Sequence, residues 1–201
     1  LVGRVEISII EEANPRLLAF RNRELDYVAV PPDLVWNVLD PPATLKPPLA
    51  KEGIVLGRGV QPAISYTYFN MEDPVVGGYT PEKIALRRAV GMGYNVPEEV
   101  RVIRQDQAFP ANQVVPPTGS GHNPKLPTRT IYNPPQARAL LDRFGYKDRD
   151  GDGFRDLPDG KPFTLMLSTA PSAIERQFDE LWVRSMKDVG LRVEFNKQKW
   201  P

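Results

Sequence analysis

The sequence has no cysteine and a single histidine, His122, among its 201 residues. Without cysteine there is no disulfide, no thiolate metal site and no cysteine nucleophile, and the redox state of the compartment is left open. One histidine excludes a histidine-based metal cluster and leaves little room for a Ser-His-Asp triad. These absences remove the commonest hydrolytic and zinc-dependent chemistries from consideration.

Long apolar runs and an excess of charge are also lacking. No apolar stretch approaches the length that spans a bilayer. The formal net charge of +1 gives no reason to expect a nucleic acid or an acidic membrane surface as partner. There is no initiator methionine and no signal peptide, as expected either of a secreted, processed chain or of a piece of a longer protein. With 41% apolar residues, the chain can build one large domain or two small ones.

The most informative stretch lies near the end of the chain. Residues 163–169 alternate apolar and polar side chains, which predicts a strand. Ser172 and Glu175 have the spacing of a capping box and predict the start of a helix. That helix has an apolar stripe that includes Phe178 and Trp182, opposite a polar face to which the pattern assigns Asp179. Gly190 ends it, and residues 191–195 alternate again as a second strand.

Two strands joined this closely by one helix predict a βαβ unit with parallel strands, and an α/β fold class for the whole chain. Ligands of such folds bind at the carboxyl ends of the strands, next to helix starts, which here means residues 169–177. Thr169, Ser172 and Arg176 are therefore candidate ligand-binding residues, because free helix amides and an Arg favour an anion. The alternative is an ordinary capped helix with a solvated Arg.

Weaker patterns occupy the rest of the chain. They predict strands over residues 3–10, 26–30, 54–56 and 63–70. They predict an ordered loop or a short helix around 34–39, and helices capped by Asn14, Thr80, Asn95 and Asn133. Proline is abundant, with 22 residues, and residues 105–131 form a long Pro-rich segment for which we expect an ordered path.

An acidic turn precedes the strand at 163–169. Its carboxylates match the spacing of a calcium loop with Gly153 at the sharp turn, and the five candidate ligands are Asp148, Asp150, Asp152, Asp156 and Asp159. The last position holds Asp rather than Glu, and a strand rather than a helix follows. The alternative is a polar turn whose Asp side chains bond their own backbone.

Tyr68 and Asn70, on the strand expected over 63–70, are further candidate ligand-binding residues. Tyr66 lies on the same strand, and Trp200 is the second-last residue of the sequence. Aromatic side chains can line a ligand pocket, but the pattern alone favours a place in the core. No pair of residues has the spacing of a known catalytic motif, so the sequence favours a protein that is not an enzyme.

Several short segments, taken in order, resemble the extracellular solute-binding proteins of the dipeptide/oligopeptide type, family 5, which feed ABC importers. The segments are FRNRELD at 20–26, YTYFN at 66–70, LRRAV at 86–90, VPP at 115–117, YNPPQARALL at 132–141, FGY at 144–146, DGDG at 150–153 and VGLRV at 189–193. The resemblance covers nearly the whole chain, and the ordered set carries it rather than any one motif.

The resemblance implies two α/β lobes that close on a ligand, in a protein more than twice this length. Residues 1–60 would then be the trailing segment of the first lobe and the approach to the hinge. Residues 61–201 would be the first part of the second, peptide-gripping lobe. Peptide binders of the family carry an Arg for the ligand carboxylate in the loop that matches 168–172, but here the first Arg is Arg176.

The resemblance further implies capture of a peptide or related small solute in the periplasm, or outside a membrane anchor, and delivery to an ABC permease. No cofactor is expected apart from the calcium considered above. An α/β enzyme domain and a calcium-stabilised interaction module are the alternatives. Since only part of a lobe is present, we also expect self-association through unpaired sheet edges, or packing of residues 1–56 onto the remaining lobe.

Overall fold

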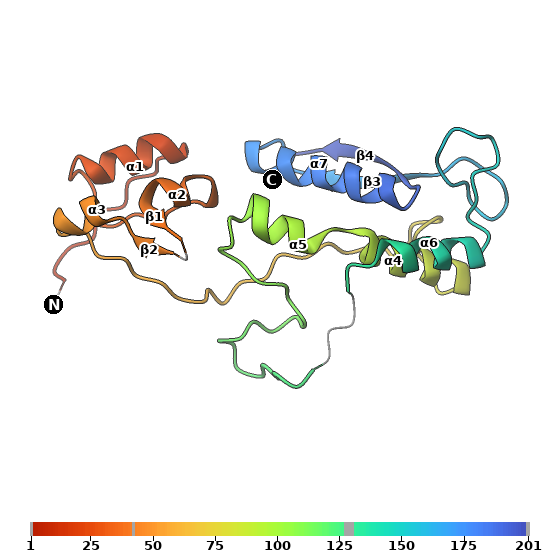
Figure 1. The fold of residues 1–201 in the computed structure, drawn as a ribbon, viewed down its shortest axis with the longest axis horizontal. Coiled ribbons are helices and arrows are strands. Elements are labelled where there is room, and N and C mark those ends of the chain that lie inside the picture. Colours follow the sequence, from red (N-terminus) through yellow and green to blue (C-terminus); the bar gives the residue numbers. More distant parts are fainter. Residues whose placement is uncertain (1, 42, 127–130, 200–201) are drawn as a thin grey trace. The chain divides into compact units, whose positions relative to one another are not determined.

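The computed structural model describes residues 2–41, 43–126 and 131–199. It divides the chain into two compact units, Leu1–Gly59 and Val60–Pro201 (Figure 1). Each unit is considered by itself below. Among the described residues, no helix is both long enough and apolar enough to cross a membrane.

The first unit is built from short elements around a small core. These are α1 (Ala13–Arg21), the 3-10 turn η1 (Pro32–Leu34), α2 (Val35–Val38), β1 (Leu39–Asp40), β2 (Thr44–Leu45) and α3 (Pro47–Lys51). The strands β1 and β2 pair antiparallel over two residues each. The buried apolar side chains of the core cluster are Val35, Val38, Leu39, Ala43 and Leu49. The helix expected within 34–39 is thus confirmed, as α2.

The second unit holds the longer elements. These are α4 (Pro81–Gly93), α5 (Val96–Glu98), the π-helix η2 (Glu99–Ile103), α6 (Pro134–Arg143), β3 (Thr164–Thr169), α7 (Ala173–Asp188) and β4 (Arg192–Lys197). The strands β3 and β4 are parallel, with Thr164 opposite Arg192 and Thr169 opposite Lys197. The predicted βαβ unit is confirmed, and Figure 1 shows α7 lying along the two strands.

One face of this two-stranded sheet is apolar and covered. Leu165 is opposite Val193 and Leu167 is opposite Phe195, and all four pack into the core of the unit. Because side chains alternate between faces, the next row on the covered side is Thr169 and Lys197. This places the last row of the ladder under the first turns of α7, since the helix runs back antiparallel to the strands.

The core of the second unit joins α4, α6 and α7. Leu86 of α4, Leu141 of α6 and Met186 of α7 are completely buried. The ring of Tyr94, just after α4, stacks on Trp182 of α7 with 4.2 Å between centroids. Burying this much apolar surface is the main stabilising contribution available to a chain without disulfides.

Three of the predicted helix caps form side-chain hydrogen bonds. The side chains of Asn95, Asn133 and Ser172 accept from backbone N–H groups three residues later. Only half of the predicted capping box is made, because the N–H of Ser172 donates to the carbonyl of Ala170 rather than to Glu175. Thr80 precedes α4 but makes no capping bond.

The cap expected at Asn14 is wrong. The helix α1 begins at Ala13, and its N-cap residue, two residues before Asn14, is Glu12, which makes no side-chain capping bond. A helix start depends on which residue first leaves extended geometry, and a cap-type side chain favours that position without enforcing it.

The predictions of strands at 3–10, 26–30, 54–56 and 63–70 are also wrong, because none of these segments has a ladder partner within the described chain. Val5, Ile7 and Ile9 are 75–89% exposed, and Tyr66 and Tyr68 are 74% and 75% exposed. Alternation makes a segment suited to a sheet, but a strand exists only where a second one pairs with it.

Candidate ligand-binding site

The candidate site is built where β3 ends and α7 begins. The hydroxyl of Ser172 accepts the N–H of Glu175 at 3.2 Å and so satisfies one first-turn amide of α7. The carbonyl of Thr169 accepts from Gln198 N–H at 2.9 Å, which ties the end of β3 to the residue after β4. The hydroxyl of Thr169 is covered and has no hydrogen-bond partner among the described residues. This is the predicted arrangement of strand end, helix start and polar side chains.

The other candidates do not join this group. Arg176 is exposed on the first turns of α7, and no ion pair in the described chain uses it. Tyr68 is exposed and its ring lies 6.2 Å from that of Tyr66. The carboxamide oxygen of Asn70 accepts the N–H of Glu72, so this side chain organises a turn. Trp200 lies outside the described residues. The role of each in binding stays a prediction.

Two residues that the sequence pattern did not single out, Lys197 and Asp179, form an ion pair at the last row of the β3–β4 ladder. Asp179 was expected on the polar face of α7, yet it is only 5% exposed. Its Oδ2 atom lies 3.1 Å from the ammonium of Lys197, the register partner of Thr169. The only sequence signal was position, because Asp179 adjoins the buried-stripe residue Phe178 and lies three residues before Trp182.

A second polar network covers the same part of α7 from the side of η2. Glu99 accepts from the hydroxyl of Tyr94 at 2.7 Å and pairs with Arg104 at 2.6 Å. The guanidinium of Arg104 lies 5.1 Å from the ring centre of Phe178 on α7. Burial first, and then the Glu99 carboxylate, raise the pKa of Tyr94 well above its usual range. The tyrosine therefore stays a neutral hydrogen-bond donor.

The pKa of Glu175 responds to the same surroundings. Burial raises it above the usual carboxyl range, and the negative charge of Asp179 one turn later adds to the rise, while Arg104 opposes it. Like charges four residues apart on a helix repel each other. The first turns of α7 thus bring two carboxylates, those of Glu175 and Asp179, into mutual repulsion.

The acidic loop brings three of its five candidate carboxylates together. Ligand oxygens of Asp148, Asp150 and Asp152 lie within 4.8 Å of one another. All three also accept backbone N–H groups of the loop, as the polar-turn alternative expects. Asp156 instead accepts Arg149 N–H at 3.0 Å, and Asp159 pairs with Lys161 at 2.8 Å. Calcium at this loop stays a prediction that concerns the first three residues.

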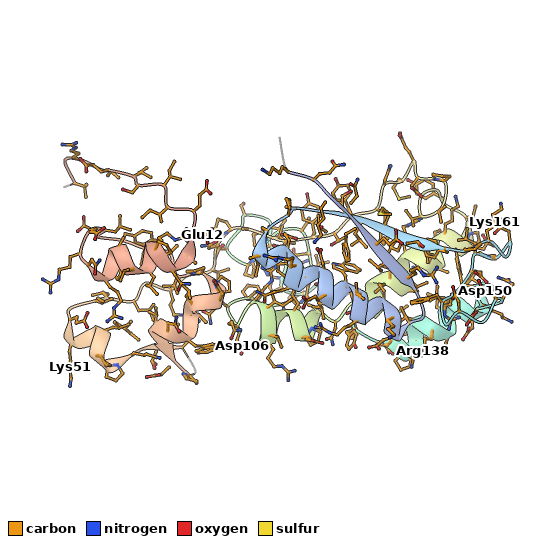
Figure 2. All side chains as sticks on the ribbon, turned by 90° about the horizontal axis from the view of Figure 1, so that it is seen from above. Glu12, Lys51, Asp106, Arg138, Asp150 and Lys161 are labelled. Atoms are coloured by element: carbon orange, nitrogen blue, oxygen red, sulfur yellow. The ribbon has the colours of Figure 1, made fainter. Side chains whose placement is uncertain are left out.

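A polar hollow of about 420 Å³ lies at the opposite end of α7. Arg155 crosses it, donating to the carbonyl of Val189 at 2.9 Å and to the carbonyl of Tyr146 at 2.6 Å. Arg138, labelled in Figure 2, donates to the carbonyl of Asp188 at 2.8 Å. Arg138 and Arg155 thus satisfy the carbonyls of Asp188 and Val189 at the carboxyl end of α7.

The sequence was then compared with known proteins. Residues 1–201 match the family described as bacterial extracellular solute-binding proteins, family 5 Middle. A di/tripeptide-binding protein 2 from Pseudomonas aeruginosa is 24% identical over 203 residues, which is 99% of this chain and 33% of that protein. The chain therefore spans a third of the length of this curated relative.

Solved structures share the fold of this chain. An oligopeptide-binding protein from Bacillus subtilis in complex with a nonapeptide aligns with 96% of this chain and 35% of its own, at 20% identity and a TM-score of 0.69. The protein NikA from Brucella suis, bound to Fe(III)-EDTA, aligns with 96% of this chain and 36% of its own, at 17% identity and a TM-score of 0.67. A periplasmic oligopeptide-binding protein from Thermotoga maritima is 26% identical over 62% of this chain and 25% of its own, with a TM-score of 0.53.

Proposed function

From the premise that this chain belongs to the bacterial extracellular solute-binding proteins of family 5, we propose that it supplies part of the ligand cleft of an ABC-importer binding protein. The solute is a peptide or a related small molecule, and the protein works in the periplasm or outside a membrane to which it is anchored. The observation that carries the proposal is the family match over residues 1–201, together with the parallel β3–α7–β4 unit.

The mechanism is capture without chemistry. Two lobes bind the solute, a hinge closes, and the closed form docks on a membrane permease. Residues 1–60 and 61–201 belong to the first and second lobe in this proposal. Specificity comes from polar groups of the cleft, because an unmatched solute leaves them buried without partners. The start of α7 offers such groups, with Thr169 and Ser172 placed at the edge of the sheet.

The experiment starts by identifying the solute. Native mass spectrometry of the full-length protein carrying this sequence is expected to show a co-purifying peptide or small solute. Calorimetry with that solute then compares wild type with Thr169→Val and Arg176→Gln, which we expect to lose affinity. Arg138→Gln, at the other end of α7, is the control and should bind as wild type does. Unchanged affinity in both site variants would contradict the proposed site, and turnover of the solute would point to an enzyme instead.

Calcium binding at the acidic loop is a separate part of the proposal. The carboxylates of Asp148, Asp150 and Asp152 are close enough to share one cation. Melting the protein with calcium and with a chelator decides between the alternatives. A higher melting temperature with calcium that disappears in Asp150→Asn supports a site, and identical curves support the polar turn.

A further inference from the structure

The inner side of α7 buries a carboxylate without hydrogen-bond donors. Both oxygens of Asp179 are covered and accept no hydrogen bond among the described residues, and the hydroxyl of Thr169 is in the same condition. The ammonium of Lys197 is near enough to Asp179, at 3.1 Å, to form an ion pair, but the geometry is not that of a hydrogen bond. Buried polar groups in this condition are rare and call for an explanation.

These atoms belong to one place in the fold. Thr169 and Lys197 form the last row of the ladder, on the face that α7 covers. The ion pair from Lys197 places Asp179 at that row, and Glu175 lies one helical turn closer to the start of α7. The cluster of Thr169, Glu175, Asp179 and Lys197 therefore has two carboxylates and one unpartnered hydroxyl against one cation.

Neighbouring cations offset this imbalance only in part. Arg104 approaches from η2 and lowers the pKa of Glu175, but it pairs with Glu99 at 2.6 Å and lies over the ring of Phe178. Arg176, on α7 itself, is exposed. A primary ammonium carries three hydrogen-bond donors, yet Asp179 accepts no hydrogen bond from that of Lys197, so its carboxylate can accept from a better-placed ammonium.

Lys197 indicates which kind of ligand group the carboxylate of Asp179 accepts. It presents an ammonium on an aliphatic stem, and its side chain is 43% exposed while that of Asp179 is 7% exposed. The exposed partner is a long, flexible chain at the end of a strand, so it is the group that can move away. An alkylammonium from outside could then take its place against Asp179 without disturbing the helix or the core.

We propose that Asp179 and Thr169, with Glu175, form a subsite for a protonated aliphatic amine of the solute, which replaces the ammonium of Lys197. This inference deepens the proposed function and rests on it. The amine comes either from a free alkylamine or diamine, or from a lysine side chain within a peptide. Lys197 acts as the resident cation that keeps the carboxylate neutralised while the site holds no solute.

Chemical rescue tests the subsite in the full-length protein. Lys197→Ala removes the resident ammonium and leaves a space for n-propylammonium. We expect n-propylammonium chloride to raise the melting temperature of this variant in a saturable way, while n-propanol or sodium chloride at equal ionic strength does not. The double variant Lys197→Ala/Asp179→Asn should show no rescue. Absence of rescue in the single variant, or equal rescue in the double variant, would overturn the proposal.

Wild-type binding distinguishes the sources of the amine. Cadaverine is compared with 1-pentanol, and the peptide Ala-Lys-Ala with the same peptide carrying norleucine. Either cadaverine or the lysine peptide should bind at least about tenfold more tightly than its neutral counterpart. The reason is that the neutral compound lacks the charged hydrogen bond to Asp179. Thr169→Val, which keeps the shape of the side chain, should reduce that preference even if Asp179→Asn fails to fold.

The two proposals fail differently. A co-purifying solute that has no amine and is bound through the start of α7 would overturn the amine subsite and leave the transport role standing. A protein that captures no solute would remove the transport role. Rescue of Lys197→Ala by n-propylammonium would still show that Asp179 accepts an external amine.

Discussion

The two units of this chain both contain alternating and helical sequence patterns, yet they bury the apolar side chains of these patterns very differently. In the second unit, twelve buried residues of α4, α6, β3, α7 and the positions flanking them make one core, ringed by partly buried apolar side chains that include Val193 and Phe195 of β4. In the first unit, the core cluster has five buried residues, and the elements are two to nine residues long. Long amphipathic elements can bury a continuous stripe, whereas short ones cover only a few side chains.

The comparison shows that an alternating segment becomes a strand only where a second segment pairs with it. Residues 163–169 and 3–10 have the same alternation, but only the former finds a parallel neighbour and a covering helix. Residues 63–70, in the second unit, also alternate but form no strand, because they too have no pairing segment among the described residues. We therefore expect stability to follow packing rather than periodicity, and the following predictions test this from the largest effect to the smallest.

Truncating a core side chain should give the largest difference in stability loss between the two units. Met186→Ala, in the second unit, is expected to cost about 2–5 kcal/mol of unfolding free energy, because the side chain is fully buried. Leu49→Ala, in the first unit, should cost less, because its small surroundings can collapse onto the space. Urea unfolding followed by circular dichroism measures both. Equal losses would mean that the first unit is as well packed as the second.

Adding a methyl group is the reverse test. A Cβ at Gly93 of α4 would lie 3.1 Å from Met186 Cε and 3.2 Å from the methyl groups of Val189. Gly93→Ala should cost about 1–3 kcal/mol through overpacking, although Ala favours a helix more than Gly does. The control is Gly57→Ala in the first unit, where nothing lies within 4 Å and little change is expected. A stabilised Gly93→Ala protein would show that α4 and α7 pack more loosely than described.

Helix caps give an intermediate effect. Ser172→Ala and Asn133→Ala should each lower the unfolding free energy by about 1 kcal/mol, because each side chain accepts a backbone N–H at the start of its helix. Asn14→Ala, within α1 of the first unit, should change little because Asn14 is not the cap. Thermal melting of the three variants is sufficient. A large loss of unfolding free energy in Asn14→Ala would indicate that Asn14 caps α1, as the sequence predicts.

The smallest effect is electrostatic. The N–H of Phe154 first, and then Arg192, lower the pKa of Asp152 below 3.8. A lowered carboxyl pKa adds stability above the unfolded value, and this contribution is lost as the pH falls through the folded value. Asp152→Asn should therefore lower the urea midpoint at neutral pH, with the difference from wild type shrinking below pH 3.8. A difference from wild type that stays the same at every pH would contradict this prediction.

Much of the candidate site was predictable because its signals are local. Ser172 as a cap, Gly190 as the helix end and Thr169 at the strand end all follow from neighbours within a few residues. Asp179 was not predictable, because its burial comes from the packing of α7 in the folded unit, where Lys197 of β4 approaches it. Likewise the acidic loop showed five candidate ligands by spacing, and only the folded loop separates Asp156 and Asp159 from the other three.

By itself, the sequence determined the elements that short-range physics controls: the amphipathic stripe of α7, the caps at Asn95, Asn133 and Ser172, and the alternation of β3 and β4. Only the tertiary structure decided which alternating segments became strands, and which acid on α7 was buried. The physical reason is that a ladder hydrogen bond and a desolvated charge each need a partner distant in sequence. A local pattern can prepare for such a partner but cannot supply it.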